Sequence, residues 1–133
     1  MARHSQGILL PCEHAAKTVI PSIRASIARV LVEDFNLSRY SAAKILRTTP
    51  AAITNYLEKR RGDKYVDRIM EDPELKQLVK RSAVMLLEIN RREDKSAYRD
   101  YQRAICLVCS RVNEIALEVG CPATMYGNGH NGG

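Results

Sequence analysis

The stretch LSRYSAAKILRTTPAAITNYLEKRRG, from Leu37 to Gly62, has the pattern of two short helices joined by a tight turn. Ser38 is a favourable N-cap for the first helix, because its side-chain oxygen can accept a bond from a free backbone N–H. The apolar stripe of that helix consists of Ala42, Ala43, Ile45 and Leu46. A small side chain such as Ala43 allows the next helix to cross closely.

The second helix of this stretch is expected to follow Arg47-Thr48-Thr49. Thr49 can cap it, and Pro50 suits a first turn, where the missing N–H is no loss. The spacing of Ile53, Tyr56 and Leu57 predicts its core-facing side. Together the two helices have the pattern of a helix-turn-helix, which predicts binding to duplex DNA.

Exposed residues near the start of such a second helix meet base edges in the major groove. Small alanines permit close approach, Thr and Asn can bond to bases, and the basic residues after the helix contact phosphates. The candidate DNA-binding residues are Arg39, Thr49, Ala51, Ala52, Thr54, Asn55, Lys59, Arg60 and Arg61. The alternative is an ordinary pair of helices with a solvated basic end.

This window resembles the Cro-like helix-turn-helix of phage repressors. More narrowly, PCE at positions 11–13, IPSIRASIARVLVEDFNLSRYSAAKIL, TPAAITNYLEKRRG and a later CLVC resemble a family of archaeal proteins predicted to be transcriptional regulators. The resemblance covers Leu10 to Gly62, and less specifically Ile105 to Cys121. It implies sequence-specific DNA binding. Arg47 departs from the pattern, since such turns usually carry Gly there, and this departure predicts a shifted or tightened turn.

Positive charge is concentrated in the half of the chain that contains this window. The 133 residues carry a formal net charge of +6. Residues 1–66 contain eleven Lys and Arg against five Asp and Glu, whereas residues 67–133 contain ten of each kind. A polyanionic partner for the first half is the natural inference.

The remaining pattern predicts an all-α fold. Helices are expected from Glu13 or Pro21 to Phe35, over 64–70, over 73–90 and over 97–119, and no β-hairpin signal is present. We expect a helix-turn-helix domain over 1–63 and a helical dimerisation and cysteine-site region with a flexible tail over 64–133. The helix that Asp72-Pro73-Glu74 opens is apolar on most sides, so a second subunit is its expected cover, which gives a homodimer.

Other classes of function find less support in the sequence. No apolar run approaches the ~20 residues needed to span a bilayer, and no signal-peptide pattern opens the chain, so we expect a cytoplasmic protein that binds no membrane. No catalytic constellation, cofactor loop or small-molecule substrate is evident, and we do not expect an enzyme. The alternative function is a helical protein–protein adaptor that binds no DNA.

Four cysteines give a second signal, because Cys106 and Cys109 form a CxxC, while Cys12 and Cys121 stand apart. Buried cysteine is often only a small apolar residue. Four is also the ligand number of a tetrahedral zinc site and of a [4Fe–4S] cluster. The resemblance implies that Cys12, Cys106 and Cys109 match the cysteines of the archaeal regulators. A single CxxC favours an iron–sulfur cluster, and the alternatives are zinc, no metal or a redox disulfide.

Helix geometry limits this set of ligands. A straight helix separates Cys109 from Cys121 by about 18 Å, whereas a cluster holds its sulfur ligands within roughly 6–7 Å of one another. Three alternatives follow: the helix breaks after Cys109, Cys121 serves the site of another subunit, or Cys121 is not a ligand.

Overall fold

The computed structural model describes residues 13, 16–59, 64–92 and 95–117, and every regular element within these ranges is helical. The predicted all-α fold is therefore confirmed for the described part of the chain. The N-terminal arm, residues 60–63 and the predicted tail lie outside it.

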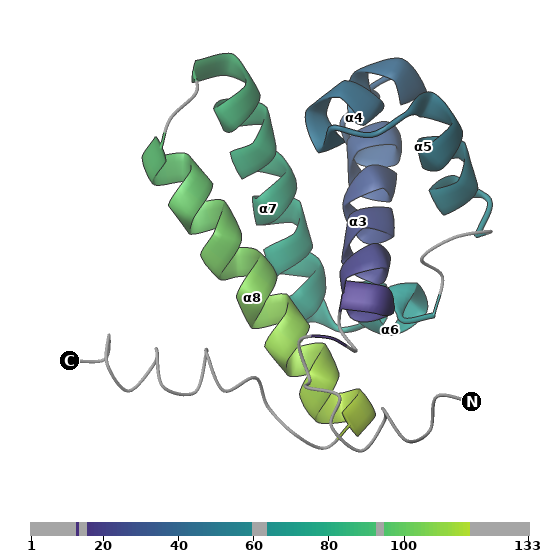
Figure 1. The fold of residues 1–133 in the computed structure, drawn as a ribbon, viewed down its shortest axis with the longest axis vertical. Helices are drawn as coiled ribbons and strands as arrows, with labels where there is room; N and C mark the ends of the chain where they lie inside the picture. The colour runs from purple at the N-terminus through teal and green to yellow at the C-terminus, as the bar shows by residue number, and fades with distance from the viewer. Residues whose placement is uncertain (1–12, 14–15, 60–63, 93–94, 118–133) are drawn as a thin grey trace.

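The N-terminal half is organised around α3 (Val19–Arg29), which continues directly into the π-helix η1 (Val30–Asp34). The sequence predicted one helix to about Phe35, and the helical path is correct, but its last turn is wider than an α-helical turn. The Phe35 amide donates to the Val30 carbonyl at 3.1 Å. Helix α3 lies at the centre of the molecule and packs against α5, α6, α7 and α8 (Figure 1).

Three short helices surround α3. The first two, α4 (Arg39–Leu46) and α5 (Pro50–Leu57), lie beside its C-terminal half, and α6 (Val66–Glu71) lies beside its N-terminal end (Figure 1). The Tyr65 amide, just before α6, donates to Ser22 Oγ of α3 at 3.1 Å. This bond joins the two helices across a long separation in sequence.

Two long helices, α7 (Pro73–Arg92) and α8 (Lys95–Leu117), form an antiparallel hairpin against α3 (Figure 1). Asp72 caps α7 as predicted, because its Oδ1 accepts bonds from the amides of Glu74 at 2.9 Å and Leu75 at 3.2 Å. An ion pair between Glu74 and Arg111 joins the two helices at their surface. The sequence placed both helices to within two residues at each end.

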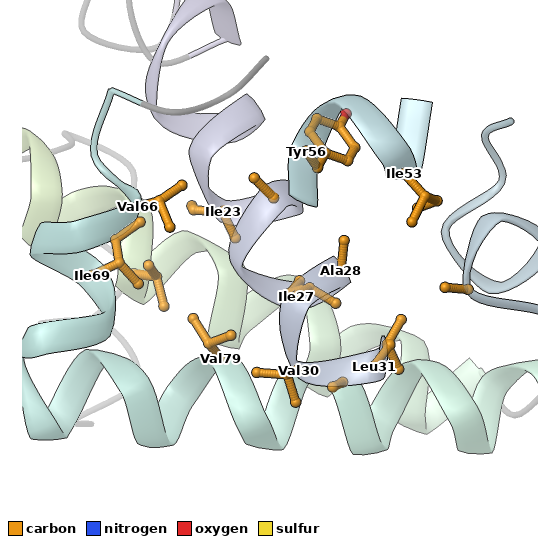
Figure 2. Close-up of a cluster of buried hydrophobic side chains, with 14 of the residues drawn as sticks. Ile23, Ile27, Ala28, Val30, Leu31, Ile53, Tyr56, Val66, Ile69 and Val79 are labelled. Atoms are coloured by element: carbon orange, nitrogen blue, oxygen red, sulfur yellow. The ribbon is translucent and has the colours of Figure 1, made fainter. Parts of the chain in front are cut away.

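Buried apolar side chains form one continuous cluster that includes members of α3, α4, α5, α6, α7 and α8. Figure 2 shows part of it, with Ile27 and Val30 between the side chains of α5 and those of α7. The cluster therefore crosses residue 63, where the sequence suggested a boundary between regions. None of the described helices has the length and apolar content needed to cross a lipid bilayer.

Candidate nucleic-acid interface

Side-chain caps define both helices of the predicted helix-turn-helix. Ser38 Oγ accepts a bond from the Ser41 amide at 3.0 Å, and Thr49 Oγ1 accepts one from the Ala52 amide at 3.1 Å. Pro50 follows at the first position of α5. Both predicted caps are therefore confirmed, and they fix where α4 and α5 begin.

The turn between α4 and α5 depends on the backbone of Arg47. Its φ of 55° and ψ of 49° are left-handed, the region that glycine enters without steric cost. The backbone amide of Thr48 donates a hydrogen bond to the Ala43 carbonyl at 2.8 Å, and this bond closes the C-terminal end of α4. Arg47 thus takes the conformation that Gly would favour, and the shifted or tightened turn that the sequence predicted is not required.

The inner side of α5 is wider than the sequence predicted. Ile53 and Tyr56 are buried as expected, but Ala52 is also buried, with 4% of its surface exposed. Its prediction as an exposed DNA contact is therefore wrong. Helix α5 packs against both α3 and α4, so its covered sector includes Ala52 in addition to the stripe.

The outer side of α5 carries the remaining candidates on that helix. Ala51 is exposed, and Thr54 and Asn55 are partly exposed. Arg39, at the start of α4, donates from Nη1 to Thr54 Oγ1 at 2.9 Å. Two predicted contacts from separate helices therefore lie side by side. The guanidinium group keeps donors for a phosphate, because it carries five N–H groups.

The basic end of α5 is only partly described. Lys59 is exposed, and its Nζ lies 3.3 Å from Asp67 Oδ1 on α6. Exposed pairs of this kind contribute little stability, so the ammonium group can exchange its carboxylate partner for a phosphate. Arg60 and Arg61 lie outside the described residues. Asp67 was not predicted as a partner of Lys59, because eight residues separate the two along the chain.

The CxxC lies on α8, with Cys106 exposed and Cys109 half-buried one turn later. Helix α8 continues from Cys109 to Leu117, so the helix does not break within these residues. Cys12 and Cys121 lie outside the described residues. Among the described residues, no group of three or more potential metal ligands is assembled.

A buried amide accompanies the second cysteine of this pair. Asn113 Nδ2 lies 3.7 Å from Cys109 Sγ, and the buried Asn113 Oδ1 has no hydrogen-bond partner among the described residues. The amide of Asn113 therefore faces the Cys109 sulfur from one turn along the same helix. The described residues thus supply two thiols on one helix face, which fit half of a four-cysteine site.

Comparison with known proteins adds no further constraint. No protein-family model, curated protein or solved structure matches the chain. The case for a function therefore depends on the chemistry of the chain itself.

Proposed function

We propose that the protein is a sequence-specific regulator that binds duplex DNA through α4 and α5. The observation that carries the proposal is the set of polar side chains on the outer side of α5. There Thr54 and Asn55 face away from the core, and Arg39 donates a hydrogen bond to the hydroxyl of Thr54. Hydroxyl and amide groups read base edges in the major groove, whereas arginine and lysine hold the phosphates beside it.

The dimensions of α5 suit this role. An α-helix with its side chains is about 10–12 Å across, which the ~12 Å wide major groove admits, and the eight residues of α5 give about two turns to lie in it. Exposed Ala51 presents only a methyl group near the start of the rod and leaves room for close approach. A helix this short must be held by its neighbours, and the packing of α5 on α3 and α4 provides that support.

Local charge supports the same partner. The segment 39–59 contains four basic residues and one acid, Glu58. One of these four, Lys44, is exposed on α4. A polyanion is attracted to such a surface, and its affinity falls steeply with salt because bound counterions are released.

We further propose that two copies bind together as a homodimer through the α7–α8 hairpin. One recognition helix makes few contacts, and a second copy on a half-site about 34 Å away doubles them. Val84 on α7 and Leu107 on α8 are large apolar residues with 48% and 43% of their surface exposed. Contact with a second subunit would cover them.

Cys106 and Cys109 would hold a metal, with Cys12 as a third ligand and Cys121 of a second subunit as the fourth. An iron–sulfur cluster is the first candidate and zinc the second. Such a group would make the fold sensitive to redox state or metal supply. Absorbance near 400 nm in anaerobically purified protein is expected for the cluster, and a colourless protein that contains zinc would decide for the alternative.

The test of DNA binding is a salt titration with random and selected duplexes. We expect affinity that falls steeply with salt, and Asn55→Ala should weaken selected-site binding by about 1–3 kcal/mol and relax base choice. Gln77→Ala, which removes an exposed amide on α7, is the matched control and should change neither. Salt-independent binding, or no binding, would contradict the proposal and favour the protein adaptor.

A separate pair of variants tests the role of Lys59. Lys59→Ala should weaken binding to all sequences alike and lower the salt dependence, because it removes a phosphate contact. Asp67→Asn should strengthen binding slightly, since it releases the ammonium group from its carboxylate. Equal affinities for both variants and the parent would show that Lys59 does not contact DNA.

A further inference from the structure

A cleft of about 400 Å³ lies where the connected end of the α7–α8 hairpin meets α3 and the turn between α4 and α5. In Figure 1 this end of the hairpin lies at the upper left, beside α4 and the upper end of α3. Two helices supply the apolar part of the cleft wall. Leu46 comes from α4, and Leu86 and Ile89 come from α7. The volume lies within the ~300–1,000 Å³ typical of small-molecule sites.

The polar part of the wall is cationic and aromatic. Arg24 of α3 and Arg47 of the turn both line the cleft, and no acidic residue is among the described residues that line it. Neither arginine forms an ion pair within the described ranges. Tyr98 and Tyr101 of α8 complete this side, with their ring centroids 6.4 Å apart.

The environment of Tyr101 shows that this side of the cleft is partly shielded from water. Burial raises the pKa of Tyr101 above its ordinary value of 10.0, and the nearby charge of Arg24 opposes the rise. A guanidinium group therefore lies close enough to a half-buried ring to affect its ionisation. Arg24 and Arg47 are themselves exposed, so an anion can reach their guanidinium groups from solvent.

We propose that this cleft binds a small organic anion, a carboxylate with a flat apolar body. Arg24 and Arg47 would pair with the carboxylate, which matches the fork of a guanidinium group. The hydroxyls of Tyr98 and Tyr101 can donate to it, and the apolar wall would hold the body of the ligand. A cation is disfavoured, since the described lining offers two positive charges and no carboxylate.

Such a ligand would touch the segment that leads into α5. Arg47 and Thr48 line the cleft, and Thr49 caps the helix directly after them. If the proposed function holds, an anion bound here would alter the affinity for DNA. The binding proposal itself does not depend on DNA, and its test contains none.

The test is an NMR chemical-shift titration of the full chain with benzoate. We expect saturable shifts at the amides of Arg47, Thr48, Tyr98 and Tyr101, with a Kd on the order of 1 mM for so small a probe. Benzamide has the same shape without the charge, and inorganic phosphate has charge without the ring. Both should bind at least about tenfold more weakly than benzoate, because benzamide lacks the charge that pairs with the arginines and phosphate lacks the ring that packs on the apolar wall.

Two arginine variants and a matched control complete the test. Arg24→Gln and Arg47→Gln should each raise the Kd for benzoate about tenfold, whereas Arg81→Gln, at an exposed position on α7 outside the cleft, should leave it unchanged. The absence of shifts at the cleft would overturn the proposal, as would equal binding of benzamide. If the two variants lose affinity for DNA but the parent protein does not bind benzoate, the proposal is also overturned. The two arginines would then be assigned to contacts with DNA phosphates.

Discussion

Arg47 stores conformational free energy in the turn before α5. A side chain with Cβ in the left-handed region costs about 1–2 kcal/mol, and glycine avoids most of that cost. Arg47→Gly should therefore raise the free energy of unfolding by about 1 kcal/mol, measured as a higher urea midpoint. Arg47→Ala removes the same charge but keeps Cβ, so it should change stability little. Equal midpoints for the two variants would show that the backbone is not strained.

Tyr101 makes stability depend on pH in the alkaline range. Burial raises its pKa in the folded state, while the unfolded chain titrates near 10.0. The stabilisation from the buried neutral phenol is therefore complete below pH 10.0 and is lost as pH rises through the folded-state pKa. Removal of the opposing charge in Arg24→Gln should raise the pKa of Tyr101 further, measured by NMR of its ring carbons. Arg81→Gln is the control, and a lower pKa in Arg24→Gln would contradict this account.

At the scale of single residues, the sequence correctly predicted the features that depend only on residues nearby along the chain. The caps at Ser38, Thr49 and Asp72 were correct because each side chain bonds to an amide two or three residues away. The prediction that Ala52 is exposed was wrong, because its burial depends on the packing of α5 against two other helices. The ion pair between Lys59 and Asp67 was missed for the same reason.

At the scale of elements, α3 contains two buried serines with different roles. The hydroxyls of Ser22 and Ser26 each donate to a carbonyl four residues earlier, at 3.0 and 2.8 Å. Ser22 Oγ additionally accepts the amide of Tyr65, which connects α3 to the start of α6. The first serine therefore joins two elements, whereas the bond of the second is internal to its helix.

This difference predicts unequal costs for the same substitution. Ser22→Ala should lower the free energy of unfolding by about 1–3 kcal/mol, because it leaves the Tyr65 amide without its acceptor. Ser26→Ala should change it by less than about 0.5 kcal/mol, since alanine is the better helix former and no second element is involved. Urea denaturation of both variants measures the difference. Equal losses would show that the link to α6 contributes nothing.

The elements themselves were predictable to different degrees. The start of α7 was correct because Asp72-Pro73-Glu74 is a local signal that requires no tertiary contact. The π-helix η1 was missed, since the Phe35 bond to Val30 inserts an extra residue into the turn and no periodic pattern encodes that insertion. The widened turn leaves Val30 and Leu31, adjacent in sequence, both buried.

At the scale of the whole molecule, the sequence predicted which helices exist but not how they dock. The apolar residues of α7 indicated burial, and the sequence assigned their cover to a second subunit. In the structure α8 and α3 supply part of that cover. The cleft was missed for the same reason, because Arg24, Arg47 and Tyr101 come from three separate segments that only the packing brings together.

A core that spans both regions predicts that the chain unfolds as one unit. Val79 of α7 is fully buried in the cluster and points toward α3 (Figure 2). Val79→Ala should lower the free energy of unfolding by about 2–3 kcal/mol, through lost burial and the cavity left behind. Methyl NMR signals of Ile53 in α5 and Val112 in α8 should then lose intensity at the same, lower urea concentration. Gln102→Ala, at an exposed position on α8, should move neither midpoint appreciably. If the Val112 midpoint fell while that of Ile53 stayed in place, the segments before and after residue 63 would be separate folding units.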